Sequence, residues 1–144
     1  PCYLSYYNIL VGGISGAEKL GLQVTYWGDG LTRELVTEAG ELVPAGGLLE
    51  LGPVLHPTQI RGLTSQAPAI HQKRIEIVPF EELPQPNRRY LLMFPRREYL
   101  PKTWNVAPPD ARPIREIRRQ GVVMAGLYER GVNRDVPPAQ ESDQ

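Results

Sequence analysis

Proline and glycine punctuate this chain more than any other feature of its sequence. The 144 residues include 15 prolines and 14 glycines, and these fall between short apolar runs rather than in one block. Because both residues interrupt helices and strands, the pattern predicts many turns that join short elements. The length suits one domain with a modest core. No apolar stretch approaches the ~20 residues that a membrane-spanning helix needs.

The charges of the chain are balanced. Lys plus Arg and Asp plus Glu both number 16, so the formal net charge is zero. This balance argues against electrostatically driven binding, and we expect no nucleic-acid partner. Cys2 is the sole cysteine, and the two histidines, His56 and His71, lie far apart. A zinc site needs several convergent ligands, so we predict no metal site and no cofactor.

A helix is predicted to follow Asp29, whose carboxylate can cap the free N–H groups of the first turn. Apolar residues then recur at helical spacing and form one stripe. Pro44 and the following glycines end the pattern. The predicted stripe consists of Leu31, Leu35, Ala39 and Leu42.

Shorter elements surround this helix. Ser15 begins a short helix that Gly21 ends, and residues 22–27 are predicted to be a strand or an extended segment. Pro57 suits the first turn of another short helix, with Ile60 and Leu63 facing inward. Gly62 and Pro68 weaken that helix. Apolar and alternating runs predict strands at 48–54, 74–80 and 89–94, the last of them central and covered on both faces.

Residues 114–119 and 122–128 flank Gln120-Gly121, where glycine favours a tight hairpin. The predicted fold class is therefore α/β: a small mixed-sheet domain with flanking helices and a C-terminal β-hairpin. We divide the chain into an aromatic, glycine-rich lead-in (1–28), an α/β domain (29–130) and a disordered tail (131–144).

The sequence offers no catalytic motif. "GGISGA" lacks the G-x-G-x-x-G spacing of a dinucleotide loop, and Ser15 is not in a G-x-S-x-G elbow. Carboxylates for glycoside chemistry are present, but their spacing singles out no pair. We therefore predict no catalytic residues in this chain. The carboxylates considered are Asp29, Glu34, Glu38, Glu50, Glu81 and Glu82.

The segment "YLSYYNILVGGISGAEKLGLQVTYWGDGLTREL" (3–35) resembles a part of bacterial multi-spanning membrane glycosyltransferases related to the dolichyl-phosphate-mannose protein mannosyltransferases. In that family the matching motifs lie just beyond the last membrane helix. "RRYLLMFPRREYLP" and "PIREIRRQGVVMAGLYER" are similar to the late strand, loop and hairpin of the family, but more weakly. The motifs of the first segment are Tyr6-Tyr7-Asn8, Gly12-Gly13, Gly16-Ala17, Tyr26-Trp27-Gly28 and Arg33-Glu34.

The resemblance implies a mannosyltransferase-like parent that transfers a sugar from a lipid-linked, polyprenyl-phosphate donor. It implies a location on the extracytoplasmic face of the cell membrane, as part of an integral membrane protein. The catalytic acid of the family lies in an early loop between membrane helices, and no residue here corresponds to it. This chain would then be a soluble, non-catalytic C-terminal domain. The implied partners are the transmembrane bundle of the same polypeptide and a lipid-linked sugar donor or acceptor.

Tyr3, Tyr6, Tyr7 and Asn8 are the candidate docking surface toward the membrane or the bundle. A tyrosine ring can leave water while its hydroxyl keeps a hydrogen bond. The alternative is that these residues cap the sheet of the domain itself, whereas the pair 26–27 should pack in or near the core. The chain begins with Pro1, which we interpret as a processed chain or a piece of a longer one. Two other functions remain open: a free-standing carbohydrate- or protein-binding module, and a small soluble enzyme.

Overall fold

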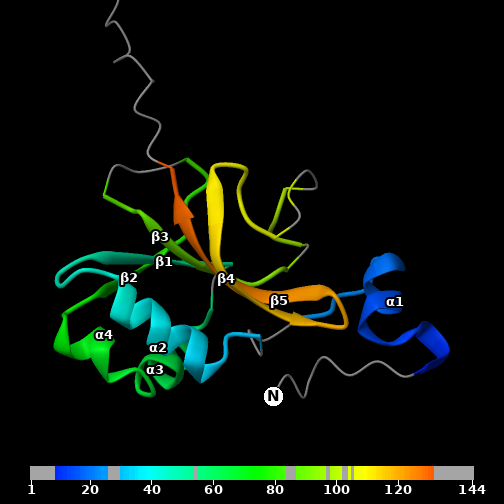
Figure 1. Cartoon of the computed structure of the whole chain (residues 1–144), viewed down its shortest axis with the longest axis horizontal. Coiled ribbons are helices and arrows are strands. Elements are labelled where there is room, and N and C mark those ends of the chain that lie inside the picture. Colours follow the sequence, from blue (N-terminus) through cyan, green and yellow to red (C-terminus); the bar gives the residue numbers. More distant parts are fainter. Residues whose placement is uncertain are drawn as a thin grey trace, which may run out of the picture.

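The structure is a computed structural model that describes residues 9–25, 30–53, 55–83, 87–96, 98–101, 104 and 106–131. Five strands form one sheet in the order β2-β1-β3-β5-β4 (Figure 1). The strands are β1 (Leu48–Gly52), β2 (Glu76–Pro79), β3 (Tyr90–Met93), β4 (Ala111–Arg119) and β5 (Val122–Arg130). The helices are η1 (Ile9–Val11), α1 (Gly13–Lys19), α2 (Arg33–Leu42), α3 (Pro57–Thr64) and α4 (Pro68–Gln72).

The sheet is mixed, as the sequence predicts. β1 pairs in parallel with both β2 and β3, whereas β5 is antiparallel to β3 and to β4. The parallel pair of β1 and β2 needs a crossover, and α3 and α4 provide it. The sheet, its flanking helices and the C-terminal hairpin of β4 and β5 confirm the predicted fold class.

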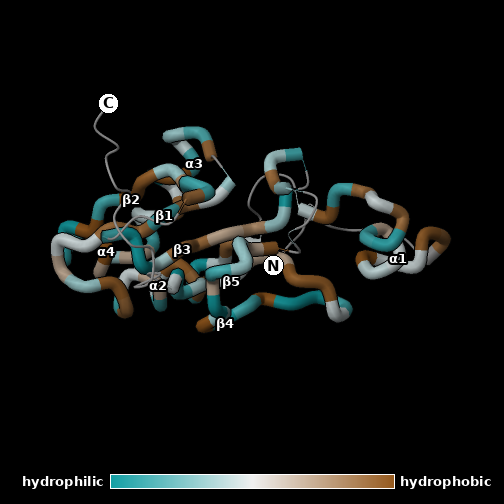
Figure 2. Tube along the Cα trace, turned by 90° about the horizontal axis from the view of Figure 1, so that it is seen from above, coloured by the Kyte–Doolittle hydropathy of each residue, from teal (hydrophilic) through white to brown (hydrophobic). Residues whose placement is uncertain are grey.

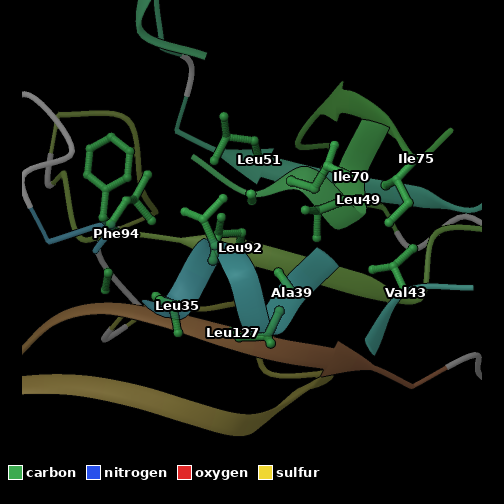
Figure 3. Packing of buried hydrophobic residues seen from close by; sticks show 14 of the residues in the cluster. Leu35, Ala39, Val43, Leu49, Leu51, Ile70, Ile75, Leu92, Phe94 and Leu127 are labelled. Carbon is green, nitrogen blue, oxygen red and sulfur yellow. The ribbon is translucent and has the colours of Figure 1, made fainter. Parts of the chain in front are cut away.

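Both faces of the central strand β3 are covered. Leu92 and the adjacent Phe94 belong to the main core beneath α2, α3 and α4, which also contains Leu35, Leu49 and Leu127 (Figure 3). Successive strand residues point to opposite faces. Accordingly, the neighbours Leu91 and Met93 join a second cluster on the other face. That cluster also contains Tyr128, with Phe80, Leu100 and Trp104 packed against it from the loops.

The predicted cap of the second helix was wrong. α2 begins at Arg33, and the Thr32 side chain accepts a hydrogen bond from the Leu35 N–H at 3.4 Å. Asp29 lies outside the described residues. The buried Gly30 explains the later start, because a Cβ built there would come within 2.2 Å of the Met124 carbonyl oxygen. The chain therefore passes tightly over β5 before the helix can begin.

The stripe of α2 is also wider than predicted. Leu35 and Ala39 are buried, as expected, but Val36 and Gly40 share the buried face and Leu42 is exposed. The reason is that α2 contacts α4 as well as the sheet. A Cβ built on Gly40 would lie 3.0 Å from the side chain of Ile70 in α4. Because α2 packs against both the sheet and α4, it needs two adjacent rows of buried side chains.

Prolines and glycines set the remaining boundaries. Pro57 begins α3 as predicted, whereas Pro68, which we expected only to weaken that helix, begins the separate helix α4. Residues 22–25 form no strand, and the pair 26–27 lies outside the described residues. Gln120 and Gly121 have φ values of 49° and 82°, which suit a two-residue hairpin turn and confirm the predicted hairpin.

Candidate functional site

The four predicted docking residues, Tyr3, Tyr6, Tyr7 and Asn8, lie outside the described residues, as does the tail 132–144. The structure does describe the segment that follows the docking residues. This segment, residues 9–22, is called the α1 unit here and consists of η1, α1 and the turn after α1. The α1 unit lies at one end of the long axis of the molecule, beside the turn of the β4–β5 hairpin (Figure 1).

The α1 unit is fixed to the hairpin by a small apolar cluster. Ile14 and Ala17 of α1, together with Val24, pack against Val122 and Met124 of β5. One polar contact supplements this cluster at the start of the helix. The Ile14 N–H donates a hydrogen bond to the side-chain oxygen Oε1 of Gln120 at 2.8 Å.

The glycines of "GGISG" meet the steric demands of this junction. Gly12 and Gly13 have φ values of 77° and 68°, which are costly for residues with a Cβ. A Cβ on Gly16 would lie 1.8 Å from the Val11 carbonyl oxygen. Since Gln120 already binds the first turn of α1, this motif is a packing device and does not provide an anion-binding loop.

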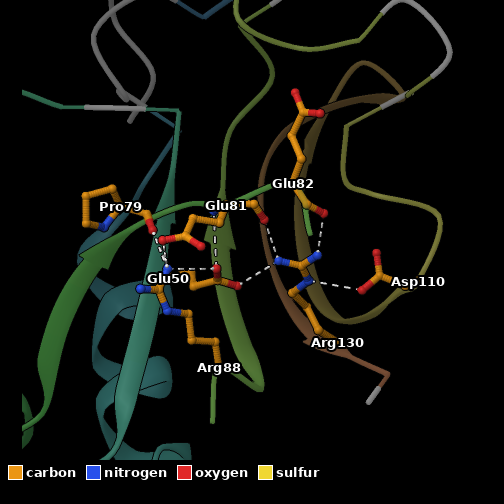
Figure 4. Close-up of polar contacts among 7 residues, drawn as sticks. All are labelled: Glu50, Pro79, Glu81, Glu82, Arg88, Asp110 and Arg130. Carbon is orange, nitrogen blue, oxygen red and sulfur yellow. Dashed lines mark hydrogen bonds and ion pairs between the residues drawn. The ribbon is translucent and has the colours of Figure 1, made fainter. Parts of the chain in front are cut away.

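The second candidate is a buried polar cluster centred on Arg130 at the end of β5 (Figure 4). Nη1 of Arg130 donates to Glu50 Oε2 on β1, and Nε donates to Asp110 Oδ2, both at 3.0 Å. Nη1 and Nη2 also donate to the carbonyl oxygens of Glu81 and Glu82, at 2.7 and 2.9 Å. The side chains of Arg130 and Glu50 are only 1% and 0% exposed.

Arg88 completes the charges of this cluster. It contacts Glu81 Oε1 at 2.8 Å and Glu50 Oε1 at 3.7 Å. The Glu81 N–H donates to the same Glu50 oxygen at 3.3 Å. Two guanidinium groups therefore face three carboxylates, since Asp110 also contacts Arg130. Each buried charge has partners, which is the condition for burying an ion pair without a large penalty.

Electrostatics favour a charged Arg130. Burial lowers the pKa of Arg130, but hydrogen bonds to Asp110 and Glu50 raise it, and the net shift is upward. An arginine in this state is a permanent cation and transfers no protons at neutral pH. The cluster also connects β5 with β1 and with the residues after β2. We therefore interpret the cluster as a structural feature that holds these segments together.

Two of the other carboxylates considered above, Glu34 and Glu38, lie at the surface, and Asp29 lies outside the described residues. Glu34 and Glu38 of α2, together with Arg115 of β4, line a wide, open depression of about 600 Å³. Arg115 contacts Glu38 Oε2 at 2.6 Å. The pKa of Glu34 is lowered by its backbone N–H and by the Thr32 hydroxyl, as expected for a carboxylate in the first turn of a helix. These features stabilise α2.

The histidines also have structural positions. His56 caps α3 in a reciprocal pair with Gln59, and His71 lies in the last turn of α4. Within the residues that the structure describes, no group of three or more His, Cys, Asp and Glu side chains could hold a metal ion. Over the same residues, no helix has the length and hydrophobicity needed to cross a membrane.

No known protein family, curated protein or solved structure matches this chain. Its function must therefore be inferred from its own residues.

From the sequence, Glu50 was only one of several candidate carboxylates, and its pairing with Arg130 was not predicted. One signal was available. Glu50 is the only charged residue within the apolar run 48–54, and Arg130 ends the long apolar part of the hairpin. A lone charge in a strand covered on both faces requires a buried partner of opposite sign. Eighty residues separate the two, so only the strand order identifies the pair.

Proposed function

We propose that this chain is the soluble, non-catalytic C-terminal domain of a membrane glycosyltransferase that transfers a sugar from a polyprenyl-phosphate donor. The domain would lie on the extracytoplasmic face of the membrane, next to the transmembrane bundle of the same polypeptide. One observation carries the proposal. The described part of the family-like segment forms a packed junction, the α1 unit on the hairpin, directly after the residues that would leave the bundle.

The requirements on the motif glycines support this interpretation. Gly12, Gly13 and Gly16 are needed because the α1 unit folds back onto itself and onto Gln120. A lead-in that only tethered two bodies would need no such close contacts. These contacts suit a connection that holds the domain at a defined angle to the part preceding it.

The buried cluster supports a non-catalytic role. Arg130 donates to the carboxylates of Glu50 and Asp110 and to two backbone carbonyls, so these groups are engaged within the fold. A catalytic acid or base must instead reach a substrate atom within about 3 Å. In our proposal the catalytic acid therefore lies in the membrane part of the enzyme, and this chain holds that part in its orientation.

The test compares the complete reading frame with this chain alone. Membranes that contain the full-length product should transfer sugar from a polyprenyl-phosphate donor, whereas the purified 144-residue chain should neither transfer nor hydrolyse it. Replacing Tyr6 and Tyr7 together by serine should leave the melting of the isolated chain nearly unchanged but reduce activity or assembly of the full-length protein. Turnover by the isolated chain that survives repurification would contradict the proposal.

A free-standing binding module is the second candidate, and one groove favours it. Between β1, β2 and α3 lies an apolar groove of about 320 Å³, lined by Leu51, Leu55, Ile60 and Ile77. Its apolar lining suits a hydrophobic segment of another protein better than a sugar, which needs hydrogen-bonding groups. Binding of peptides or glycans by the isolated chain, combined with a reading frame without membrane spans, would favour this candidate.

A further inference from the structure

Exposed leucines cluster in the α1 unit. The described residues expose seven large hydrophobic side chains, and three of these lie between positions 10 and 22. The exposed fractions are 89% for Leu10, 66% for Leu20 and 41% for Leu22. The other four lie singly along the rest of the chain. Single exposed hydrophobic residues are normal, whereas a cluster of them indicates a surface that something covers.

The fold of the α1 unit presents these leucines outward. The buried face of α1 is occupied by Ile14 and Ala17, which pack on the hairpin. Leu20 and Leu22 flank Gly21, whose φ of 75° allows the turn that ends the helix. Seven helical residues span about 10 Å, so leucines from both ends of α1 can contribute to one patch. The hydropathy colours show apolar residues at the outer end of this unit (Figure 2).

Basic residues occur in α1 and in the strand that leads to its contact on the hairpin. Lys19 is exposed in the last turn of α1. Arg118 and Arg119 are exposed just before Gln120, which itself contacts α1. The carboxylates nearby in the chain are Glu18 and Glu116, and Glu116 is ion-paired with Arg118 at 2.6 Å. Along these two segments three cations (Lys19, Arg118 and Arg119) therefore face two carboxylates, an excess of one positive charge. Exposed apolar side chains beside basic ones are typical of segments that lie in a membrane interface.

We infer that Leu10, Leu20 and Leu22 form the surface by which this domain rests on a lipid bilayer. The leucines would enter the headgroup region, with Lys19 directed toward lipid phosphates. The inference rests on the proposed function, because the membrane bundle would bring this end of the domain to the bilayer. The α1 unit lies at one end of the molecule (Figure 1), and the exposed Lys19 directly precedes Leu20. We therefore favour a bilayer with anionic headgroups as the partner, because the lysine can pair with phosphate while the leucines enter the apolar layer.

Vesicle binding by the whole 144-residue chain tests the inference. The chain should sediment with vesicles of phosphatidylcholine and phosphatidylglycerol at millimolar lipid. The triple variant Leu10→Ser, Leu20→Ser, Leu22→Ser should bind at least about tenfold more weakly, because it removes three leucines that would be partly buried in the lipid. A control triple variant at exposed positions elsewhere, Leu42→Ser, Leu83→Ser and Ile114→Ser, should bind like the parent chain.

A fluorescent label reports which surface enters the lipid. Cys2 is the only cysteine, so a Cys2→Ser background accepts one new label site. An environment-sensitive dye on Leu20→Cys should shift to shorter wavelength with vesicles, whereas the same dye on Leu42→Cys should not. Circular dichroism melts of both labelled proteins check that the fold is retained.

Three results would overturn the inference: no binding by the parent chain, equal binding by the two triple variants, or equal dye shifts at both sites. A fourth is a dimer, seen by sedimentation without lipid, that the leucine variants abolish, because the surface would then bind a second copy of the chain. The sugar-transfer assay of the full-length protein is independent of all four. Failure of that assay would contradict the proposed function while leaving the vesicle result to stand.

Discussion

Replacing Arg130 by methionine removes a buried cation and keeps most of the side-chain volume. Among the described residues, the fully buried Glu50 then retains Arg88 at 3.7 Å and the N–H of Glu81 as its partners. The carbonyl oxygens of Glu81 and Glu82 also lose their hydrogen bonds. Breaking a buried pair from one side costs about 3–5 kcal/mol. We expect a loss in that range, which is a large part of the ~5–15 kcal/mol typical of a domain.

The assay is equilibrium unfolding in urea, followed by circular dichroism. The matched control is Arg89→Met, because Arg89 is the neighbouring arginine and its partner Glu129 lies on the surface. An exposed ion pair contributes about 0.2–1 kcal/mol, so the control should shift the midpoint little. If Arg130→Met unfolds too readily to measure, Asp110→Asn removes one ionic partner while keeping the guanidinium buried, and should cost less.

The double variant Glu50→Leu, Arg130→Met separates the penalty of an unpaired charge from the net value of the pair. With both charges gone, no fully buried charge is left unpaired. The groups that lose a partner are the two carbonyls, the Glu81 N–H and the partly exposed Asp110 carboxylate, so stability should recover most of the loss. The reasoning would be refuted if Arg130→Met cost no more than Arg89→Met. It would also be refuted if the double variant were as unstable as the sum of its single variants.

Four further variants test the helix cap, the core packing and the burial of Tyr128. Thr32→Ala should cost about 1 kcal/mol by removing the cap of α2, and Leu35→Ala about 2–5 kcal/mol because Leu35 is fully buried; unchanged urea midpoints would contradict both. Gly30→Ala should lower the melting temperature clearly, since its Cβ would meet the Met124 carbonyl oxygen. An unchanged melting temperature would show that the backbone at this contact can move apart without loss of stability. Burial raises the pKa of Tyr128, so the stability linked to this tyrosine is present below its unfolded pKa of about 10 and is lost as the pH rises above it; Tyr128→Phe should flatten that alkaline loss in melts between about pH 9 and 11.

Local sequence signals predicted the elements whose causes are local. Gly21 ends α1 because the N–H groups of Gly21 and Leu22 bind the carbonyls of Glu18 and Ala17, and a glycine takes the required positive φ. The hairpin turn at Gln120 and Gly121 has the same kind of cause. These signals need only a few neighbouring residues, so the sequence carries them completely.

Features that depend on distant residues could not be predicted in this way. Asp29 and Thr32 are both good caps by type, and the contact of Gly30 with β5 decides between them. Pro68 can end one helix or begin another, and the packing of α4 on α2 decides in favour of the second. The partner of Glu50 depends on strand order.

The candidate site also depends in part on residues that are distant in the sequence. The sequence predicted residues 1–28 to be a lead-in from a membrane part, and that stays a prediction. What the structure adds is that the described part of this segment packs on the hairpin. The exposed leucines were not predicted, because Leu10, Leu20 and Leu22 have the same residue type as the leucines of the core. Only the position of α1 against β5 shows which leucines it leaves uncovered.

Strand β5 connects the proposed membrane-facing unit with the rest of the domain. Val122 and Met124 hold α1, Leu127 belongs to the main core, and Tyr128 to the cluster on the opposite face. Arg130 then joins the end of the same strand to β1. Because a strand with residues in all three clusters cannot shift its register without disturbing each of them, β5 fixes the α1 unit relative to the sheet. The role that we propose, holding a membrane-embedded enzyme at a defined distance and angle, requires a rigid connection of this kind.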